Sequence, residues 1–219
     1  EMKRRMGQPW PRCTANLEPL SPSWTPPFTP VDAAAALRKD GAVSLLATCR
    51  IDPSVVPVAG MTGGASAGMA RWASYLNEGL SRYHRTRNNA ANRGGVSGMS
   101  PWLHHGMVAA TRLVRDAAEH GTKGAEKFLD EMLVFREHAY HHAHDVDRPY
   151  AWDHVPDWAR ASWRNTALVH PARPAMDLER AQSNDVLWNA AQRGVVRHGV
   201  MHNNVRMTWG KGTVQWLSC

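Results

Sequence analysis

With 219 residues, 43% of them hydrophobic, the chain is long enough for one large domain with a buried core. Its net charge of +7 comes from 26 Lys and Arg against 19 Asp and Glu. That charge favours a polyanionic partner, nucleic acid first, although a merely soluble basic protein fits it equally well. Ten Trp against three Phe and four Tyr is the unusual feature of the composition.

The cysteines exclude two classes of small stabilised domain. Cys13, Cys49 and Cys219 are scattered and form no C-x-x-C pair, so neither a disulfide framework nor a zinc site is indicated.

No apolar run approaches the roughly 18 residues of a membrane span. We therefore expect no membrane partner and a reducing location, in the cytoplasm or in the nucleus of a eukaryotic cell.

Residues 1–60 are expected to be a Pro-rich linker or interdomain segment. Seven prolines fall between positions 9 and 30, and Pro53 and Pro57 then keep the chain extended. Only the stretch from Asp32 to Lys39 has helical composition, with Asp32 as a plausible N-cap. The chain begins with Glu rather than Met and ends without a helix stop signal, so both ends are expected to be cuts within a longer protein.

Residues 61–219 are expected to be a helical domain, incomplete at its C-terminus. Apolar side chains recur at three- and four-residue steps from Met69 to Tyr83, and a second apolar stripe runs from Phe128 to Phe135. We find no alternating strands and no repeats, so the predicted fold class is all-α, a bundle of six or more helices. The expected helices span about 65–83, 100–120, 123–144, 156–166, 178–182, 185–198 and 200–216.

Start and stop signals define several of these helices. Ser100 reads as an N-cap and Pro101 as the first helical residue. Gly121 and Gly199 are expected to end two helices in the left-handed conformation.

The loop from Gly94 to Pro101 is a candidate phosphate-binding segment. Its glycines allow close backbone approach, and free N–H groups before a helix suit an anion. The alternative, favoured on this loop alone, is a flexible turn with a good N-cap.

The C-terminal tryptophans have two interpretations. Trp209 and Trp216 are seven residues apart, which would place them two turns apart on one face of a helix, about 10 Å along its axis. Aromatic rings at that spacing fill a bundle core, or form a path for electrons.

Five ordered motifs resemble the DNA photolyase and cryptochrome family, over roughly residue 40 to the C-terminus. The C-terminal motifs are most similar to those of class II cyclobutane-dimer photolyases. The motifs are Ile51-Asp52-Pro53-Ser54-Val55; Tyr83-x-x-x-Arg87 followed by the loop with Ser97; Met99-Ser100-Pro101-Trp102-Leu103-His104-His105-Gly106; Phe128-Leu129-Asp130-Glu131-Met132-Leu133-Val134-Phe135-Arg136-Glu137; and Leu187-Trp188-Asn189-Ala190 with Met201-His202-x-x-Val205-Arg206-Met207 and Trp209.

The resemblance implies a helical domain that binds FAD in a bent form. Glu131, Phe135 and Arg136 fall where the family contacts the damaged DNA, although Phe135 replaces a residue that is usually tryptophan. Trp209, Trp188 and Trp216 match the electron-transfer tryptophans that reduce the flavin under light. The implied FAD-binding residues are Tyr83, Arg87, Ser97, Met99 and Ser100, towards the phosphates and ribose, and Asn203 and Arg206, near the flavin.

The function implied by the resemblance is light-dependent repair of cyclobutane pyrimidine dimers in damaged DNA by an electron from reduced FAD. The family's N-terminal antenna domain, and the Asp that pairs with the counterpart of Arg206, are absent from this sequence. The alternative is a non-catalytic relative, either a flavin photoreceptor or a DNA-binding domain.

A histidine-rich segment offers a third hypothesis. Glu137 and His141, and His138 and His142, are spaced one helical turn apart, as in metal-binding helices. No HExxH motif accompanies them. Solvated or DNA-facing histidines are therefore the favoured interpretation, and no metal ligand is assigned.

Overall fold

The computed structural model describes residues 25–30, 32, 34, 42–165 and 172–216. The chain forms two compact units, which are separated in sequence between Val58 and Ala59. In the first unit, the described residues contain the short helix α3 (Ala42–Leu46). The helix expected over 32–39 and the prolines before residue 25 lie almost wholly outside the described residues.

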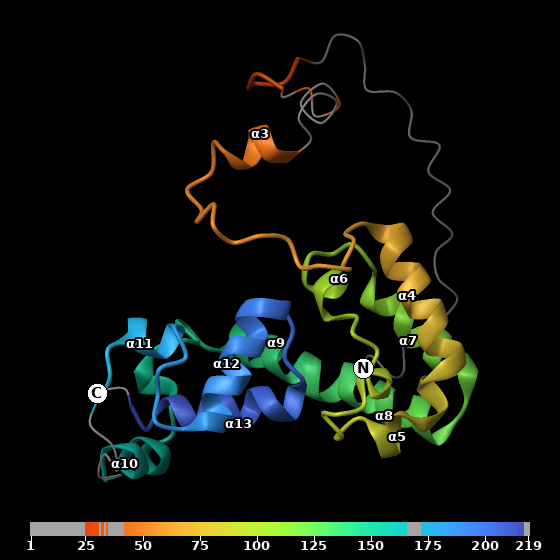
Figure 1. The fold of residues 1–219 in the computed structure, drawn as a ribbon. Helices are drawn as coiled ribbons and strands as arrows, with labels where there is room; N and C mark the ends of the chain where they lie inside the picture. The colour runs from red at the N-terminus through yellow and green to blue at the C-terminus, as the bar shows by residue number, and fades with distance from the viewer. Residues whose placement is uncertain (1–24, 31, 33, 35–41, 166–171, 217–219) are drawn as a thin grey trace. The chain divides into compact units, whose positions relative to one another are not determined.

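The second unit confirms the all-α prediction, because every regular element among its described residues is helical (Figure 1). None of the described helices is long and apolar enough to cross a bilayer. The elements are α4 (Ala65–Glu78), η1 (Leu80–Arg82), α5 (Tyr83–Thr86), η2 (Arg93–Gly95), α6 (Ser100–His104), α7 (Ala110–His120), α8 (Lys123–Asp130), the π-helical turn η3 (Glu131–Phe135), α9 (Arg136–Asp145), η4 (Trp152–His154), α10 (Asp157–Asn165), α11 (Ala175–Glu179), α12 (Val186–His198) and α13 (Asn203–Thr213).

Two predicted helix ends are confirmed at glycine. Gly121 follows α7 with φ 63° and Gly199 follows α12 with φ 65°, a left-handed conformation that costs glycine little. At the other end of α12, the Asp185 carboxylate accepts hydrogen bonds from the N–H groups of Leu187 and Trp188, which fixes the start of that helix.

Four predicted helices are wrong in extent. The helix expected over 178–182 is α11, which ends at Glu179. The helix expected over 100–120 is two helices, because Gly106 takes φ 65° and ends α6 one turn after it begins. Met99 rather than Ser100 is the N-cap of α6. The segment from Met69 to Tyr83 breaks at Gly79, and α13 ends at Thr213, so Trp216 lies in the turn after the helix.

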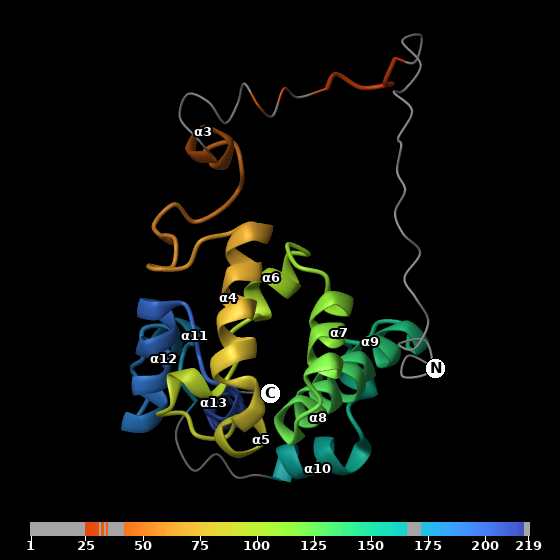
Figure 2. The same ribbon diagram turned by 90° about the vertical axis from the view of Figure 1, so that its right-hand side faces the viewer.

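The main core is built where α8 packs against α5, α7 and η1 (Figure 2). The Trp72 ring lies 5.2 Å from that of Phe128, and its Nε1–H donates to Asp116 at 2.9 Å, so this large buried indole has a satisfied polar end. Both apolar stripes predicted from the sequence are confirmed as core-facing, except at Phe135. The buried members of this core are Trp72, Tyr75, Leu80, Met99, Trp102, Val108, Leu113, Val114, Ala117, Ala125, Phe128 and Met132.

Gly124 permits the close approach of α8 to η1. A Cβ at this position would collide with the backbone carbonyl oxygens of Leu80 and Ser81. We expect Gly124→Ala to destabilise the fold by about 3 kcal/mol, because backbone atoms cannot move aside as a flexible side chain can. In thermal denaturation this corresponds to a Tm lowered by roughly 6–12 °C.

Gly194→Ala is the matched control for this prediction. Gly194 is also helical, but a Cβ there would meet no atom within 4 Å. The substitution should stabilise α12 by about 0.5–1 kcal/mol. Equal Tm values for the two variants would contradict the close packing of α8 on η1.

Candidate functional site

The three tryptophans predicted as site residues, Trp188, Trp209 and Trp216, pack together, and we call them the tryptophan cluster. The rings of Trp188 and Trp209 are stacked, with centroids 5.8 Å apart and planes within 12°. Trp216 meets Trp188 edge to face at 5.2 Å. Trp188 is therefore the middle member, and the seven-residue spacing of Trp209 and Trp216 is not what brings the rings together.

The turn after α13 places Trp216 against the other two rings. The backbone N–H of Trp216 donates to Thr213, and its carbonyl accepts from the N–H of Arg173 at 2.9 Å. The Trp216 side chain is only 1% exposed. A segment distant in sequence therefore holds the third ring in a dry position.

Gly212 allows the Trp188 indole to lie directly on α13. A Cβ at Gly212 would approach the Trp188 Cδ1 atom to 2.8 Å, closer than real Cβ contacts. The Trp188 Nε1–H also donates to the Trp209 backbone oxygen at 2.9 Å. The absence of a side chain at Gly212 thus permits the close contact between α12 and α13.

Asn189, the third residue of the Leu-Trp-Asn-Ala motif, forms three hydrogen bonds with Ser183. Its Oδ1 accepts from the Ser183 N–H at 2.9 Å and from the Ser183 hydroxyl at 2.8 Å, and its Nδ2 donates to the Ser183 carbonyl at 2.8 Å. All three bonds fix the loop that leads into α12. Asn189 therefore supports the helix that carries Trp188.

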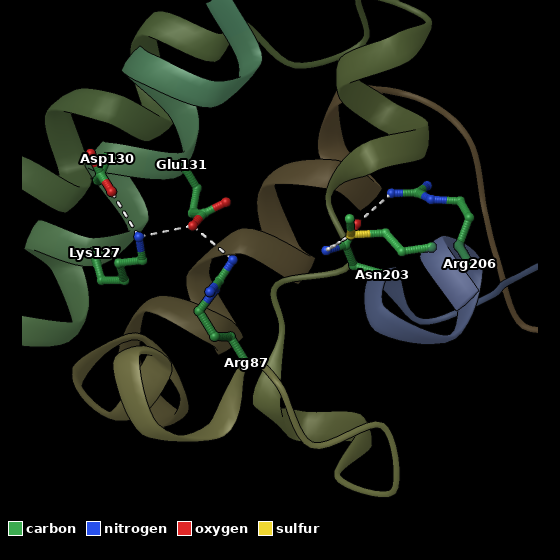
Figure 3. Close-up of polar contacts among 7 residues, drawn as sticks. Arg87, Lys127, Asp130, Glu131, Asn203 and Arg206 are labelled. Carbon is green, nitrogen blue, oxygen red and sulfur yellow. Dashed lines mark hydrogen bonds and ion pairs between the residues drawn. The ribbon is translucent and has the colours of Figure 1, made fainter. Parts of the chain in front are cut away.

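Glu131 lies at the centre of a half-buried ion cluster (Figure 3). Its Oε1 is 2.7 Å from Arg87 Nη2 and 3.0 Å from Lys127 Nζ, and Lys127 also pairs with Asp130 at 2.7 Å. Hydrogen bonds to Asp130 and Glu131 raise the pKa of the Lys127 ammonium above its usual value. The resemblance assigned Arg87 to the cofactor and Glu131 to the DNA; the structure ties the two together.

Tyr83 supports this cluster from α5. Its ring packs edge-on against Phe128 at 5.6 Å, and the Arg87 guanidinium carbon lies 5.7 Å from its centroid. Burial raises the pKa of the Tyr83 phenol, so the hydroxyl stays protonated at neutral pH. It can therefore act as a hydrogen-bond donor.

The π-helical turn η3 begins at Glu131 and ends at Phe135. Such turns are rare, and they often occur at functional sites. Phe135 is 61% exposed, whereas Met132 within the same turn is buried. The Lys127 ammonium lies 5.4 Å from the Phe135 ring centroid, and the next residue, Arg136, stacks on Tyr140 at 4.9 Å. An exposed aromatic ring flanked by cations results.

The loop with Ser97 is held from α4 by Arg71. The guanidinium Nε donates to the Ser97 carbonyl at 2.8 Å and Nη2 donates to the Val96 carbonyl at 3.2 Å. In a trans peptide the N–H points opposite to the C=O, so the N–H groups of Ser97 and Gly98 point away from Arg71. Neither N–H donates to another described residue.

The other loop residues differ in what they expose. Ser100 is exposed, whereas the Met99 side chain is 1% exposed and belongs to the core. The Ser97 hydroxyl accepts from the Met99 N–H at 3.4 Å and keeps its own proton for another acceptor. The Met99 carbonyl accepts the Leu103 N–H at 3.1 Å, so both polar groups of the Met99 backbone are bonded within the chain.

Asn203 and Arg206 form a separate exposed pair on α13 (Figure 3). Arg206 Nη2 donates to Asn203 Oδ1 at 2.9 Å. Within the described part of the chain, no carboxylate pairs with Arg206. Asn204, which follows Asn203, donates to the Asn88 carbonyl at 3.1 Å and joins α13 to the loop after α5.

The histidine-rich segment does not form a metal site with other described residues. His141 and His144 both contact Asp145, at 3.1 Å and 3.0 Å. No group of three or more His, Cys, Asp or Glu among the described residues is placed to hold a metal ion. The hypothesis of a metal-binding helical protein therefore has no geometric support there.

The Gln192 and Asn184 side-chain oxygens accept the indole N–H groups of Trp209 and Trp216, respectively. Four residues of these sites were not predicted from the sequence: Arg71, Lys127, Asn184 and Gln192. Gln192 follows Trp188 by four residues, so the helical period could have placed it beside the cluster. Lys127 precedes Glu131 by the same interval. Arg71 and Asn184 carry no such local signal, because their partners are distant in sequence.

The all-helical fold of the described residues is consistent with the helical domain of the class of photolyases and cryptochromes. No protein-family model matches the chain. Three curated relatives are each named deoxyribodipyrimidine photo-lyase. The one from Methanothermobacter thermautotrophicus is 33% identical over 172 residues, which are 76% of this chain and 36% of that protein.

The other two relatives agree. The protein from Potorous tridactylus is 30% identical over 76% of this chain and 32% of its own length, and that from Arabidopsis thaliana is 32% identical over 73% and 33%. The chain belongs to the DNA photolyase family. It spans about a third of the length of the curated relatives it matches.

Proposed function

We propose that this chain is the FAD-binding, DNA-facing part of a class II photolyase, with residues 61–219 as the helical domain and residues 1–60 as the segment before it. The proposed activity is light-dependent repair of cyclobutane pyrimidine dimers in damaged DNA. The relatives' names support a photolyase. The observation that carries the proposal is the tryptophan cluster, because rings 5.2 Å and 5.8 Å apart make a continuous path for an electron.

The loop at 97–100 fits the phosphates of FAD. The N–H groups of Ser97 and Gly98 are turned to one side and donate to no other described residue. The hydroxyls of Ser97 and Ser100 can donate to the same anion. Such converging donors form an anion-binding concavity, so these residues would hold the pyrophosphate.

FAD, when bound, supplies the electron that splits the dimer. The chain's own residues would return the flavin to its reduced form and hold it in position. Trp209, Trp188 and Trp216 would pass an electron from ring to ring, through two buried indoles and the half-buried indole of Trp209. Asn203 and Arg206 supply a donor pair that would orient the flavin ring edge.

The DNA side of the proposal rests on η3 and the ion cluster. Photolyase chemistry requires the lesion to leave the duplex, which costs least for a damaged pair. The exposed Phe135 ring offers a stacking surface, and Arg136 offers charge to phosphate. The Glu131 carboxylate, held by Arg87 and Lys127, is an acceptor for a base N–H.

The decisive activity test is repair of a dimer-bearing oligonucleotide under blue light by the FAD-loaded protein. Repair in the light, with none in the dark, is the expected result. Light-driven flavin reduction without repair would favour the alternative, a flavin photoreceptor or DNA-binding relative. The observation that favours this alternative is Phe135, a smaller stacking surface than the tryptophan usual in the family.

Arg71→Gln is expected to weaken FAD binding by about tenfold, or roughly 1.4 kcal/mol. The substitution removes two charge-assisted bonds that fix the Val96 and Ser97 carbonyls, so the loop N–H groups lose their common direction. Equilibrium titration with FAD measures the effect. Arg71→Lys should restore part of the affinity.

Arg82→Gln removes the same charge at an exposed position, where the side chain donates to the Glu78 carbonyl four residues earlier. It should leave FAD affinity unchanged. If Arg71→Gln binds FAD as the wild type does, the loop does not depend on this guanidinium.

A further inference from the structure

All three indole N–H groups of the tryptophan cluster donate to oxygens that are not bases. Trp209 Nε1 donates to the Gln192 side-chain oxygen at 3.1 Å, Trp216 Nε1 to the Asn184 side-chain oxygen at 2.7 Å, and Trp188 Nε1 to the Trp209 carbonyl at 2.9 Å. An indole has a single donor, so these bonds engage all three. Among the described residues, no carboxylate or histidine contacts these nitrogens.

This pattern matters when an indole is oxidised. In the proposed electron path, Trp209 would give one electron to light-excited oxidised flavin and would become an indole radical cation with an acidic N–H. Electron transfer from Trp188 and then from Trp216 would move the positive charge away from the flavin, and a thiol reductant would finally return the electron. If a base took the N–H proton first, the neutral radical would trap the charge at that ring.

We propose that Gln192 and Asn184 act as positioning residues that keep the oxidised tryptophans protonated, so that the charge moves between rings instead of being trapped. The inference rests on the proposed electron path. A base must lie within hydrogen-bond distance of the indole N–H to remove its proton. The amide oxygens of Gln192 and Asn184 fill these positions at Trp209 and Trp216, and an amide oxygen does not take up the proton.

The orientation of the Gln192 amide is fixed independently of Trp209. Its Nε2 donates to the Glu179 carbonyl at the end of α11, at 3.0 Å, and the side chain is 8% exposed. A flipped amide would set its NH2 group against the Trp209 N–H, so that two donors face each other. It would also set its oxygen against the Glu179 carbonyl oxygen, so that two acceptors face each other. The carbonyl oxygen is therefore the atom that faces the indole.

The test introduces a base at this position. In Gln192→Glu, a carboxylate replaces the amide oxygen at the Trp209 N–H; in Gln192→His, an imidazole can accept there and still donate to Glu179. After a light flash on the FAD-loaded protein, we expect the neutral tryptophan radical to form at least about 100-fold faster in these variants, the low end of what a positioned base contributes.

Ala190→Glu is the matched control, because it adds the same charge to an exposed position of α12. It should behave as the wild type. In deuterium oxide, decay of the tryptophan radical cation should slow in Gln192→Glu but not in the wild type. Altered packing alone would not give this isotope effect.

The outcomes separate the inference from the function it rests on. No tryptophan radical in the wild type would overturn the electron path, and the inference with it. A wild-type radical that loses its proton as fast as the radical in Gln192→Glu and Gln192→His would overturn the inference alone.

A second measurement needs no flavin. In the flavin-free chain, the Trp209 indole N–H should exchange with deuterium at least about tenfold faster in Gln192→Met than in the wild type, since loss of about 1.4 kcal/mol of protection corresponds to that factor. Equal exchange would overturn the assigned bond.

Discussion

Trp209→Phe is expected to slow light-driven reduction of bound FAD by about 100-fold, equivalent to roughly 2.7 kcal/mol of barrier. Phenylalanine keeps an aromatic ring against Trp188, but a benzene ring gives up an electron far less readily than an indole. FAD occupancy should hold, because the loop at 97–100 is untouched. Flavin absorbance during blue illumination, with a thiol as reductant, measures the rate.

Two controls define this result. Trp158→Phe makes the same change in α10 at a ring that is 76% exposed and outside the tryptophan cluster, so photoreduction should be unchanged. In Trp209→Phe, the buried Gln192 oxygen loses its donor, at a stability cost of about 1–3 kcal/mol. A folded variant that reduces its flavin at the wild-type rate would reject the electron path.

Glu131→Gln is expected to lower dimer repair by about 10- to 100-fold while leaving flavin photoreduction intact. A hydrogen bond to a charged acceptor contributes about 1.5–3 kcal/mol, and the amide lacks that charge. The ion pairs of Glu131 are only partly buried, with side chains 20–24% exposed at Arg87 and Glu131. Their loss should therefore cost about 1 kcal/mol of stability or less.

Asp130→Asn is the matched control, because Asp130 also pairs with Lys127 but is 40% exposed. It should repair at the wild-type rate. Equal loss of repair in both variants would show that the ion cluster acts through general charge, not through contact of Glu131 with a base. Lost photoreduction in Glu131→Gln would instead place this carboxylate on the cofactor side.

The fold could be predicted where a local rule dominates. The three- and four-residue spacing identified the core faces of α4 and α8, and Gly121 and Gly199 marked two helix ends. The helix break at Gly106 was missed because a single glycine is also tolerated inside a helix, so its presence does not by itself mark a helix end. The sequence pattern from Lys123 to Asp145 is helical throughout, so the π-helical turn at Glu131 left no signal in it.

The candidate site could be predicted in part. The resemblance named the three tryptophans, and the structure brings them together, but with Trp188 in the middle and Trp216 outside the helix. The pairing of Arg87 with Glu131 crosses 44 positions and follows from the packing of α5 on α8. Arg71 was missed for the same reason, since its contact with the Ser97 loop depends on tertiary structure.

The most direct measurement is the absorption spectrum of the purified protein, loaded with FAD and desalted, before and during blue illumination with a thiol. We predict equimolar bound FAD, whose oxidised absorption band bleaches in the light in the wild type and persists in Trp209→Phe. Loss of all flavin on desalting, or equal bleaching in the two proteins, would contradict the proposal that this helical domain holds FAD beside an electron path of tryptophans.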